Sequence, residues 1–576
     1  MSNKLSRADL LLLTAWLALL VVAGAWSTLA LPYISDDFEH GQLIAQIRAG
    51  LAPGLSLITT PFHGQTDVLV RLLFWFGTLA GGMSLTWVRL GICAAHVVGA
   101  VGCAILCTRW TGSRLTGCLA GSLYAGALGF IGEQIWWPSS GIFCLGMTFL
   151  IFTMVALDPD AKDPKLALAV SVLMLTLAAL GLNGILVAAL GIPIFLRRRE
   201  AIVFGAAIAV LLILTFLQHD QDQVKLSFRG MELGAWIIFT APFRFFSAFT
   251  PFAPGFRTVW KLAPFAWLAL LASAWFVNAR YRRVLLIVWT PAILLALLVG
   301  MARADYPFRF GPGSLYTADR YYYVFLFPLV TQCVLFLSAI RLPRWVALAI
   351  LAAALVGSRA HYLANVPRGN FEASGRALER GRLLVEKIHS SSARPMILSD
   401  ASIPLDGARN NALSLAFLIY SEYPHGIPGV RLVRQTAIEK SPSSWVDFKA
   451  RSFEENLTFG FSWWEAPFRW MGERASLQLI AGPGDLVISA YAPVDQLHRA
   501  IHVTVTVNDR PAGVFAITAP GVHDYHLQPP ALAPGSTANV TLTSDFVWHA
   551  RDIFPDSFDD RDLSIALSAI GFGMGN

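Results

Sequence analysis

Two adjacent carboxylates, Asp36 and Asp37, stand in the sequence YISDDFEHG, a few residues after a long apolar segment, residues 9–31. If that segment crosses a membrane, the pair lies where the helix leaves the bilayer. Neighbouring carboxylates repel each other, and this raises the pKa of each. Such a pair can take a proton from a substrate or bind a cation. The alternative is a pair of solvated loop acids without a chemical role.

The composition places much of the chain in a membrane. Of the 576 residues, 55% are hydrophobic and 14% are charged, whereas soluble domains contain about 25% charged residues. The net charge is +7, but the basic residues form short clusters between apolar segments. Clusters of this kind are typical of helix ends that face the cytoplasm, so they argue against nucleic-acid binding. All six cysteines fall in apolar segments, and an external part without cysteine suits a bacterial periplasm.

The basic clusters also predict a topology, because the spans between two cytoplasmic clusters must come in pairs. Eleven apolar segments approach the length of a span. They are residues 8–31, 86–108, 115–132, 139–157, 165–181, 184–196, 201–217, 261–277, 283–301, 319–340 and 342–358. An odd number of crossings places the N-terminus inside and the C-terminal part outside.

Residues 67–82 are apolar as well, but a crossing there would move every later basic cluster to the outer side. We therefore expect an amphipathic helix on the outer surface that carries Asp67 and Arg71. The first external loop then extends over residues 32–85. It also contains His63, which either joins a site with the acids or is a hydrogen-bonded structural histidine.

After Ser358 the composition becomes that of a soluble protein. Residues 371–390 predict an amphipathic helix, residues 395–400 a short strand, and residues 411–420 a helix or a buried strand.

From residue 456 onward, short segments of alternating polarity are separated by turn signals such as Asn508–Asp509. This pattern predicts a β-sandwich of jelly-roll type. The predicted parts are a membrane domain (1–358), an external α/β segment (359–455) and an external β-sandwich (456–576).

Several motifs, in their order along the chain, resemble those of the GT-C-type membrane glycosyltransferases. They are YISDDFEHG, FHGQTDVLVRLL leading into TWVRLG, and ADRYYY before a late span. The resemblance covers about residues 1–358. The stretch GFSWWEAPFRW and the ending FDDRDLSIALSAIGF resemble a C-terminal β-sandwich of bacterial members. The implied fold is a polytopic α-helical membrane protein with an external C-terminal part.

The resemblance implies a reaction. Such enzymes move a sugar from a polyprenyl phosphate or diphosphate donor to an acceptor at the outer face, usually with inversion. An acid of the first-loop motif is the general base or binds a divalent cation, which we assign to Asp36 and Asp37, with Asp36 as the base. Many members hold another acid in the second external loop, where Glu133 stands in GEQIWWP. The implied acceptor is an envelope glycan, a glycolipid or a protein.

The leaving phosphate needs cationic groups, and arginine binds phosphate oxygens with two parallel N–H groups. The late external loop offers Arg303, Arg309 and Arg320, the last beside three tyrosines. We expect at least one of them to bind the donor phosphate. For each alone, a structural anchor at the headgroup level is an equal alternative. Arg71 and Arg244 are weaker candidates.

Two other function classes remain. A transporter or flippase for lipid-linked glycans would have many spans, but it should show internal repeats and charges within its helices. A non-catalytic protein of envelope assembly would explain the β-sandwich but not the Asp pair. Within the enzymes, a glycan ligase or polymerase is the nearest rival. We therefore predict a glycosyltransferase in the inner membrane of a bacterium, with a periplasmic C-terminal part.

Overall fold

The computed structural model describes most of the chain. The described residues are 5–33, 37–59, 67–81, 84–157, 163–182, 185–189, 192, 198–218, 228–251, 256–277, 279–302, 319–340, 343–391, 396–400, 402–404, 412–434, 444–448, 457–465, 468–553 and 562–573. The chain forms two compact units, residues 1–434 and 435–576. The first unit therefore contains both the helices of the predicted membrane domain and most of the predicted α/β segment.

Seven helical stretches of the described chain are long and apolar enough to span a membrane, so the protein is an integral membrane protein. They are Arg7–Thr28, Thr86–Thr111, Pro138–Ala156, Thr258–Phe276, Tyr281–Met301, Arg320–Ala339 and Arg344–Asn365. Helices α6 (Arg114–Ala125) and α7 (Leu128–Trp136) meet at 43° and make an eighth span if they are counted together.

These stretches correspond to eight of the eleven predicted segments. Their main helices are α1 (Arg7–Ala25), α5 (Thr86–Thr111), α8 (Ile142–Ala156), α13 (Phe256–Phe276), α14 (Ala279–Ala302), α18 (Leu326–Ala339) and α19 (Arg344–Asn365).

The other three predicted segments contain shorter apolar helices or a fragment. Helices α9 (Pro164–Gly181) and α11 (Arg198–Gln218) match two of them, and α10 (Ile185–Ala189) is the only helix described in the segment 184–196. Helix α12 (Phe228–Ser247) is absent from the predicted segments. Its sequence includes Arg229, Glu232 and Arg244, which interrupt the apolar pattern. The total of eleven crossings stays a prediction.

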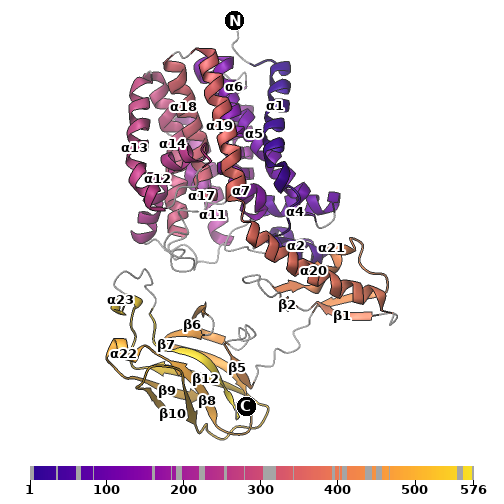
Figure 1. The fold of residues 1–576 in the computed structure, drawn as a ribbon, viewed down its shortest axis with the longest axis vertical. Helices are drawn as coiled ribbons and strands as arrows, with labels where there is room; N and C mark the ends of the chain where they lie inside the picture. Colours follow the sequence, from indigo (N-terminus) through magenta and orange to yellow (C-terminus); the bar gives the residue numbers. More distant parts are fainter. Residues whose placement is uncertain are drawn as a thin grey trace. The chain divides into compact units, whose positions relative to one another are not determined.

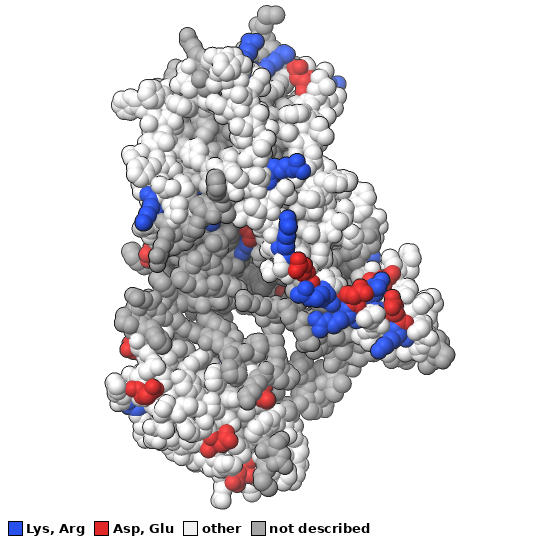
Figure 2. Space-filling view, in the orientation of Figure 1, with Lys and Arg blue, Asp and Glu red and all other residues white. Residues whose placement is uncertain are grey.

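The ends of the helices follow their sequences. At the start of α1 the Ser6 hydroxyl accepts a hydrogen bond from the Asp9 backbone N–H (3.1 Å), and the Asp9 carboxylate accepts one from the Ser6 N–H (2.9 Å). This capping box satisfies two N–H groups that the helix leaves unpaired. On the face shown in Figure 2, charged side chains are sparse over the helices of this bundle and gather over α20 (Arg368–Ser390).

The first loop contains α2 (Asp37–Arg48), α3 (Ser56–Thr59) and α4 (Val68–Gly81), and α4 confirms the helix predicted over residues 67–82. Helix α21 (Leu415–Glu422) packs against α2 and against α20 at one end of the bundle (Figure 1). Buried apolar side chains of α2, α4 and α21 form one hydrophobic cluster. The α/β segment is thus packed onto the first loop.

Two small sheets complete this segment. Strands β1 (Met396–Asp400) and β4 (Val430–Arg434) pair in parallel, and β2 (Ser402–Pro404) pairs with β3 (Ala412–Ser414) in antiparallel fashion. Strand β1 confirms the strand predicted at 395–400, and α20 confirms the amphipathic helix at 371–390. For residues 411–420, helix is the correct alternative over most of the range.

The second unit is built on a nine-stranded sheet of order β10-β9-β12-β7-β13-β8-β11, in which β5 also pairs with β13 and β6 with β7. The strands are β5 (Trp445–Asp447), β6 (Leu457–Glu465), β7 (Phe468–Ile480), β8 (Leu486–Tyr491), β9 (Ile501–Val507), β10 (Arg510–Ile517), β11 (His523–Leu527), β12 (Thr537–Ser544) and β13 (Ala566–Phe572). Short helices α22 (Val494–Leu497) and α23 (Ala550–Ile553) lie between strands.

Local sequence explains much of this sheet. Along β9, buried residues alternate with more exposed ones, as the two-residue period of a strand requires. Asn508 and Asp509 have φ values of 51° and 62°, which fit the two-residue hairpin turn that joins twisted strands. Phe515 of β10 stacks on Tyr525 of β11 at 4.4 Å between ring centroids. The two end strands thus approach each other, and the predicted β domain is one nearly barrel-shaped sheet.

Candidate active site

Four of the eight predicted site residues lie in the described part of the chain: Asp37, Glu133, Arg320 and Arg71. The other four, Asp36, His63, Arg303 and Arg309, lie outside the described residues.

Asp37 is the first residue of α2, and its side chain is fully buried. Its Oδ1 accepts hydrogen bonds from the backbone N–H of Ser139 (2.9 Å) and from the Ser139 hydroxyl (2.5 Å). Ser139 lies in the short 3₁₀ helix η2 (Pro138–Gly141). A carboxylate at a helix N-terminus is stabilised by the helix dipole, and the two donors from Ser139 stabilise its charged form further.

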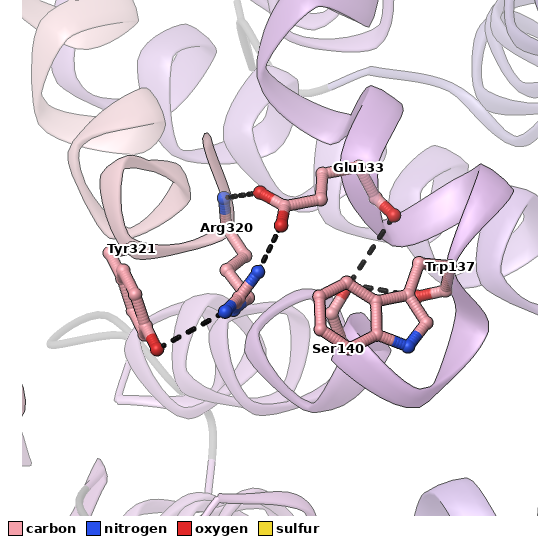
Figure 3. Close-up of polar contacts among 5 residues, drawn as sticks. All are labelled: Glu133, Trp137, Ser140, Arg320 and Tyr321. Atoms are coloured by element: carbon pink, nitrogen blue, oxygen red, sulfur yellow. Dashed lines mark hydrogen bonds and ion pairs between the residues drawn. The ribbon is translucent and has the colours of Figure 1, made fainter. Parts of the chain in front are cut away.

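Glu133 of α7 and Arg320 of α17 (Asp319–Tyr322) form a buried ion pair, although they are 187 residues apart in the chain (Figure 3). The Glu133 Oε1 contacts the Arg320 Nη1, and its Oε2 accepts a hydrogen bond from the Arg320 backbone N–H at 2.8 Å. The Arg320 guanidinium also lies over the ring of Trp137, 4.5 Å from its centroid. Charge pairing and a cation–π contact therefore fix the guanidinium.

The short stretch from Glu133 to Ser140 connects the two acids. Trp137 precedes Pro138, and a residue before proline is disfavoured in the α conformation, so α7 ends at Trp136. The Ser140 hydroxyl then donates to the Trp137 carbonyl at 2.8 Å. As a result, the segment that pairs with Arg320 at one end binds Asp37 at the other.

Arg89, in the first turn of α5, is fully buried and holds the same region together. Its guanidinium donates to five backbone carbonyls. These are the carbonyls of Leu29, Leu31 and Pro32 before the Asp pair, and of Ile135 and Trp136 after Glu133. Arg89 thus ties the chain that leads to Asp37 to the chain that follows Glu133. An arginine within a predicted membrane span costs free energy and therefore indicates a structural or functional role. The position of Arg89 in the predicted span 86–108 was the sequence signal for this role.

Two of the three tyrosines that follow Arg320 anchor its turn to other helices. The Tyr322 hydroxyl lies 3.0 Å from the Thr240 Oγ1. The Tyr323 hydroxyl lies 2.9 Å from the His96 Nδ1 and 3.0 Å from the Tyr124 hydroxyl. These two tyrosines thus tie the turn that carries Arg320 to other helices of the bundle, while the Tyr321 hydroxyl accepts a hydrogen bond from Arg320 itself.

Arg71 lies in a different buried cluster. Its Nε is 3.5 Å from the Asp67 Oδ1, and the Asp67 Oδ2 is 3.3 Å from the His40 Nε2. Burial lowers the pKa of the Arg71 guanidinium, and the carboxylates of Asp67 and Glu39 oppose that shift. The described contacts therefore link α2 to α4 through Asp67, which lies between His40 and Arg71.

Within the described residues, no group of three or more His, Cys, Asp or Glu side chains could hold a metal ion.

Arg244 of α12 lies over the ring of Tyr322, 5.4 Å from its centroid. Arg244 thus contacts the tyrosine turn.

No protein-family model and no curated protein matches the chain. Two solved structures are similar to it. ArnT from Cupriavidus metallidurans bound to undecaprenyl phosphate has a TM-score of 0.46 and 14% identity, over 73% of this chain and 86% of that chain. ArnT from the same organism in the apo state has a TM-score of 0.41 and 13% identity, over 71% and 84%.

Proposed function

We propose that the protein is a membrane glycosyltransferase that moves a sugar from a polyprenyl-phosphate-linked donor to a hydroxyl of an envelope glycan, glycolipid or protein. The observation that carries the proposal is the arrangement around residues 133–139. There a buried arginine is fixed by Glu133, while Asp37, the second acid of the pair, is held by Ser139. A transferase of this kind needs a base and a cationic group for the leaving phosphate.

In the proposed reaction Asp36 takes the proton of the acceptor hydroxyl. The acceptor oxygen forms a bond to the anomeric carbon, and the bond from that carbon to the phosphate oxygen breaks. The electron pair of the broken bond leaves with the polyprenyl phosphate. Asp37, held by two hydrogen bonds from Ser139, orients the loop that carries Asp36 or binds a cation.

Arg320 binds the donor phosphate in this proposal. A guanidinium keeps its charge in an apolar site and presents several N–H donors in one plane. Glu133 fixes that plane through its two oxygens, which favours a positioning role for Glu133 over that of a second base. Arg303 and Arg309 belong to the same predicted external loop and are further candidates for the phosphate.

The proposed location is the inner membrane of a bacterium, with the α/β segment and the β domain on the periplasmic side. Its support is the distribution of basic clusters, which face the cytoplasm in the predicted topology.

Labelling from outside should modify single cysteines introduced at Ser35 and Ser443, and it should spare one introduced at Ala161. Labelling of Ala161 or protection of Ser443 would reject this topology.

The deciding experiment is a transfer assay on the full-length protein in proteoliposomes, with radiolabelled polyprenyl-phosphate-linked sugars and host membranes as the source of acceptor. Asp36→Asn and Asp37→Asn should leave the protein folded and able to bind the donor. At least one of them should lose transfer by about 10²–10⁴-fold, the contribution typical of a general base. Asp545→Asn, on the surface of the sheet unit, is the matched control and should transfer normally.

Two outcomes would reject the proposal. Full turnover by both Asn variants would show that the acid pair has no part in the chemistry. A wild-type protein that moves the glycolipid between leaflets, but releases no polyprenyl phosphate, would be a transporter.

A further inference from the structure

Among the described residues, four other tryptophan indoles have a hydrogen-bond acceptor, whereas the indole of Trp137 has none. The Nε1–H groups of Trp16, Trp267, Trp289 and Trp548 each donate to an oxygen at 2.8–3.1 Å. The Nε1 of Trp137 is buried and has no hydrogen-bond partner within the described residues. A buried donor without an acceptor costs free energy, so an instance in a native protein calls for an explanation.

Contacts hold the main chain of Trp137 and cover one face of its ring. Its backbone N–H donates to the Glu133 carbonyl at 2.9 Å, and its own carbonyl accepts from the Ser140 hydroxyl at 2.8 Å. The ring face is covered by the Arg320 guanidinium, 4.5 Å from the centroid (Figure 3). The main chain of Trp137 is thus held by two hydrogen bonds and one ring face contacts a cation, so the Nε1–H is the polar group of the indole without a partner among the described residues.

The chemistry of the two side chains defines what that molecule is. An indole N–H and a guanidinium are both donors and accept nothing. A partner for both must present acceptor oxygens, and the positive charge beside the ring favours an anion. A phosphate group meets both conditions, because its ionised oxygens only accept. A neutral sugar hydroxyl meets only the first.

We propose that Trp137 donates its Nε1–H to an oxygen of the donor phosphate, next to Arg320, and is thus a phosphate-binding residue. This inference rests on the proposed function, because it uses the same lipid-linked donor. Trp137 then has two roles. The face of its ring orients Arg320, and its Nε1–H binds the phosphate. The main chain of Trp137 is held by hydrogen bonds on both sides, and a preorganised donor loses less entropy on binding.

The test compares Trp137→Phe with Trp136→Phe in the full-length protein in detergent. Phenylalanine keeps an aromatic face for Arg320 and removes only the N–H. The control residue Trp136 lies edge-on to Phe371, with 6.3 Å between ring centroids. The probes are undecaprenyl phosphate and undecaprenol, which differ in the phosphate alone. Trp137→Phe should weaken binding of the phosphate by about 10-fold or more, as expected for a lost hydrogen bond to a charged group.

The same variant should bind undecaprenol like the wild type, and Trp136→Phe should bind both probes like the wild type. Unchanged phosphate affinity in Trp137→Phe would overturn the inference and make Trp137 an anchor at the membrane surface. An equal loss for undecaprenol would overturn it as well, because the N–H would then not act on the phosphate.

A second measurement needs no variant. With ¹⁵N-labelled tryptophan, one indole N–H resonance of the wild type should shift downfield on addition of undecaprenyl phosphate and stay in place with undecaprenol. The absence of such a shift would contradict the inference.

The outcomes also separate this inference from the proposed function. If the wild type binds undecaprenyl phosphate through Trp137 but transfers no sugar, the phosphate site stands and the transferase proposal fails. If the wild type transfers sugar but Trp137→Phe binds the phosphate normally, the reverse holds.

Discussion

In the helical unit the charged side chains around the proposed site are buried, whereas the ion pair of His502 with Asp545 in the sheet unit lies at the surface. Arg89 and Asp37 are fully buried, and the side chains of Glu133 and Arg320 are 7% and 10% exposed. The side chains of His502 and Asp545 are 55% and 39% exposed. The sheet unit instead buries an aliphatic core that its alternating strands supply.

This difference has an energetic meaning. A charge in an apolar interior must be paired and hydrogen-bonded, and removal of one partner costs about 3–5 kcal/mol. An exposed ion pair contributes about 0–1 kcal/mol. The burial of Arg89 and Glu133 therefore costs desolvation free energy, which their partners offset, and those partners fix their positions. Substitution of Asp545 should change the free energy of unfolding little. Substitutions of charged residues should thus disturb the helical unit more than the sheet unit.

The largest effect is expected for Arg89→Met. Methionine keeps much of the side-chain volume and leaves five backbone carbonyls without their donor. At about 1 kcal/mol for each lost hydrogen bond, the free energy of unfolding should fall by about 5 kcal/mol. Thermal unfolding in detergent measures the loss, and hydrogen exchange should rise in residues 29–32 and 133–141. The matched control is Arg109→Met, because the Arg109 side chain is exposed, where it donates to the Val155 carbonyl at 2.7 Å.

A result in which Arg89→Met and Arg109→Met unfold at the same temperature would show that the carbonyl cluster does not hold the two segments. Arg89→Lys should recover only part of the loss, because an ammonium has three donors and lacks the planar fork.

A second large effect is expected where the α/β segment supports the first loop. Phe417 of α21 packs against Tyr33 and Phe38, with ring centroids 5.1 and 5.8 Å apart. Phe417→Ala should cost about 3–5 kcal/mol through the cavity it leaves. Because Phe38 neighbours Asp37, the variant should also lower sugar transfer. Phe515→Ala, in the sheet unit, removes a ring of the same size and should leave transfer unchanged.

Equal transfer by the two Phe variants would mean that α21 stabilises the fold without positioning the acids. A lower transfer only in Phe515→Ala would assign the supporting role to the sheet unit instead.

The ion pairs give the most direct contrast between the units. Glu133→Gln removes the charge that faces Arg320 in a buried site and should cost about 3 kcal/mol. Asp545→Asn breaks an exposed pair and should cost less than about 1 kcal/mol. Thermal unfolding of both variants, at low and high salt, measures the contrast. Added salt should weaken the wild-type contribution of Asp545 and leave that of Glu133 largely intact. Similar costs for the two variants would contradict the energetic difference between the buried and the exposed pair.

The smallest effect concerns pH and the same Asp545. Slight burial alone would raise the pKa of its carboxyl, but the His502 backbone N–H and imidazole, with Arg499, lower it below the usual value. A depressed pKa in the folded state stabilises the protein above the unfolded pKa, about 4. That contribution is lost as the pH falls through the folded pKa. The protection of β9 amides, corrected for the intrinsic pH dependence of hydrogen exchange, should therefore fall below about pH 4, and Asp545→Asn should remove this dependence.

Local patterns in the sequence predicted much of the secondary structure. The apolar segments are confirmed as helices where they are described, the amphipathic segments 67–82 and 371–390 as α4 and α20, and the turn at Asn508–Asp509 as a hairpin. These features depend on neighbouring residues, because helix and strand periods and turn conformations are local properties. Helix α12 was missed because its three charged residues break the apolar pattern.

The sequence by itself determined that this is a membrane protein, with an acid pair after its first apolar segment and an arginine just before three tyrosines at residues 321–323. The tertiary structure decided which of these groups meet. Glu133 and Arg320 are 187 residues apart, Arg89 reaches carbonyls of two other segments, and Phe417 lies on the first loop. No local period encodes such contacts. They arise because buried charges and donors must find partners wherever the fold brings them, and the unpartnered edge of Trp137 is visible only once those partners are in place.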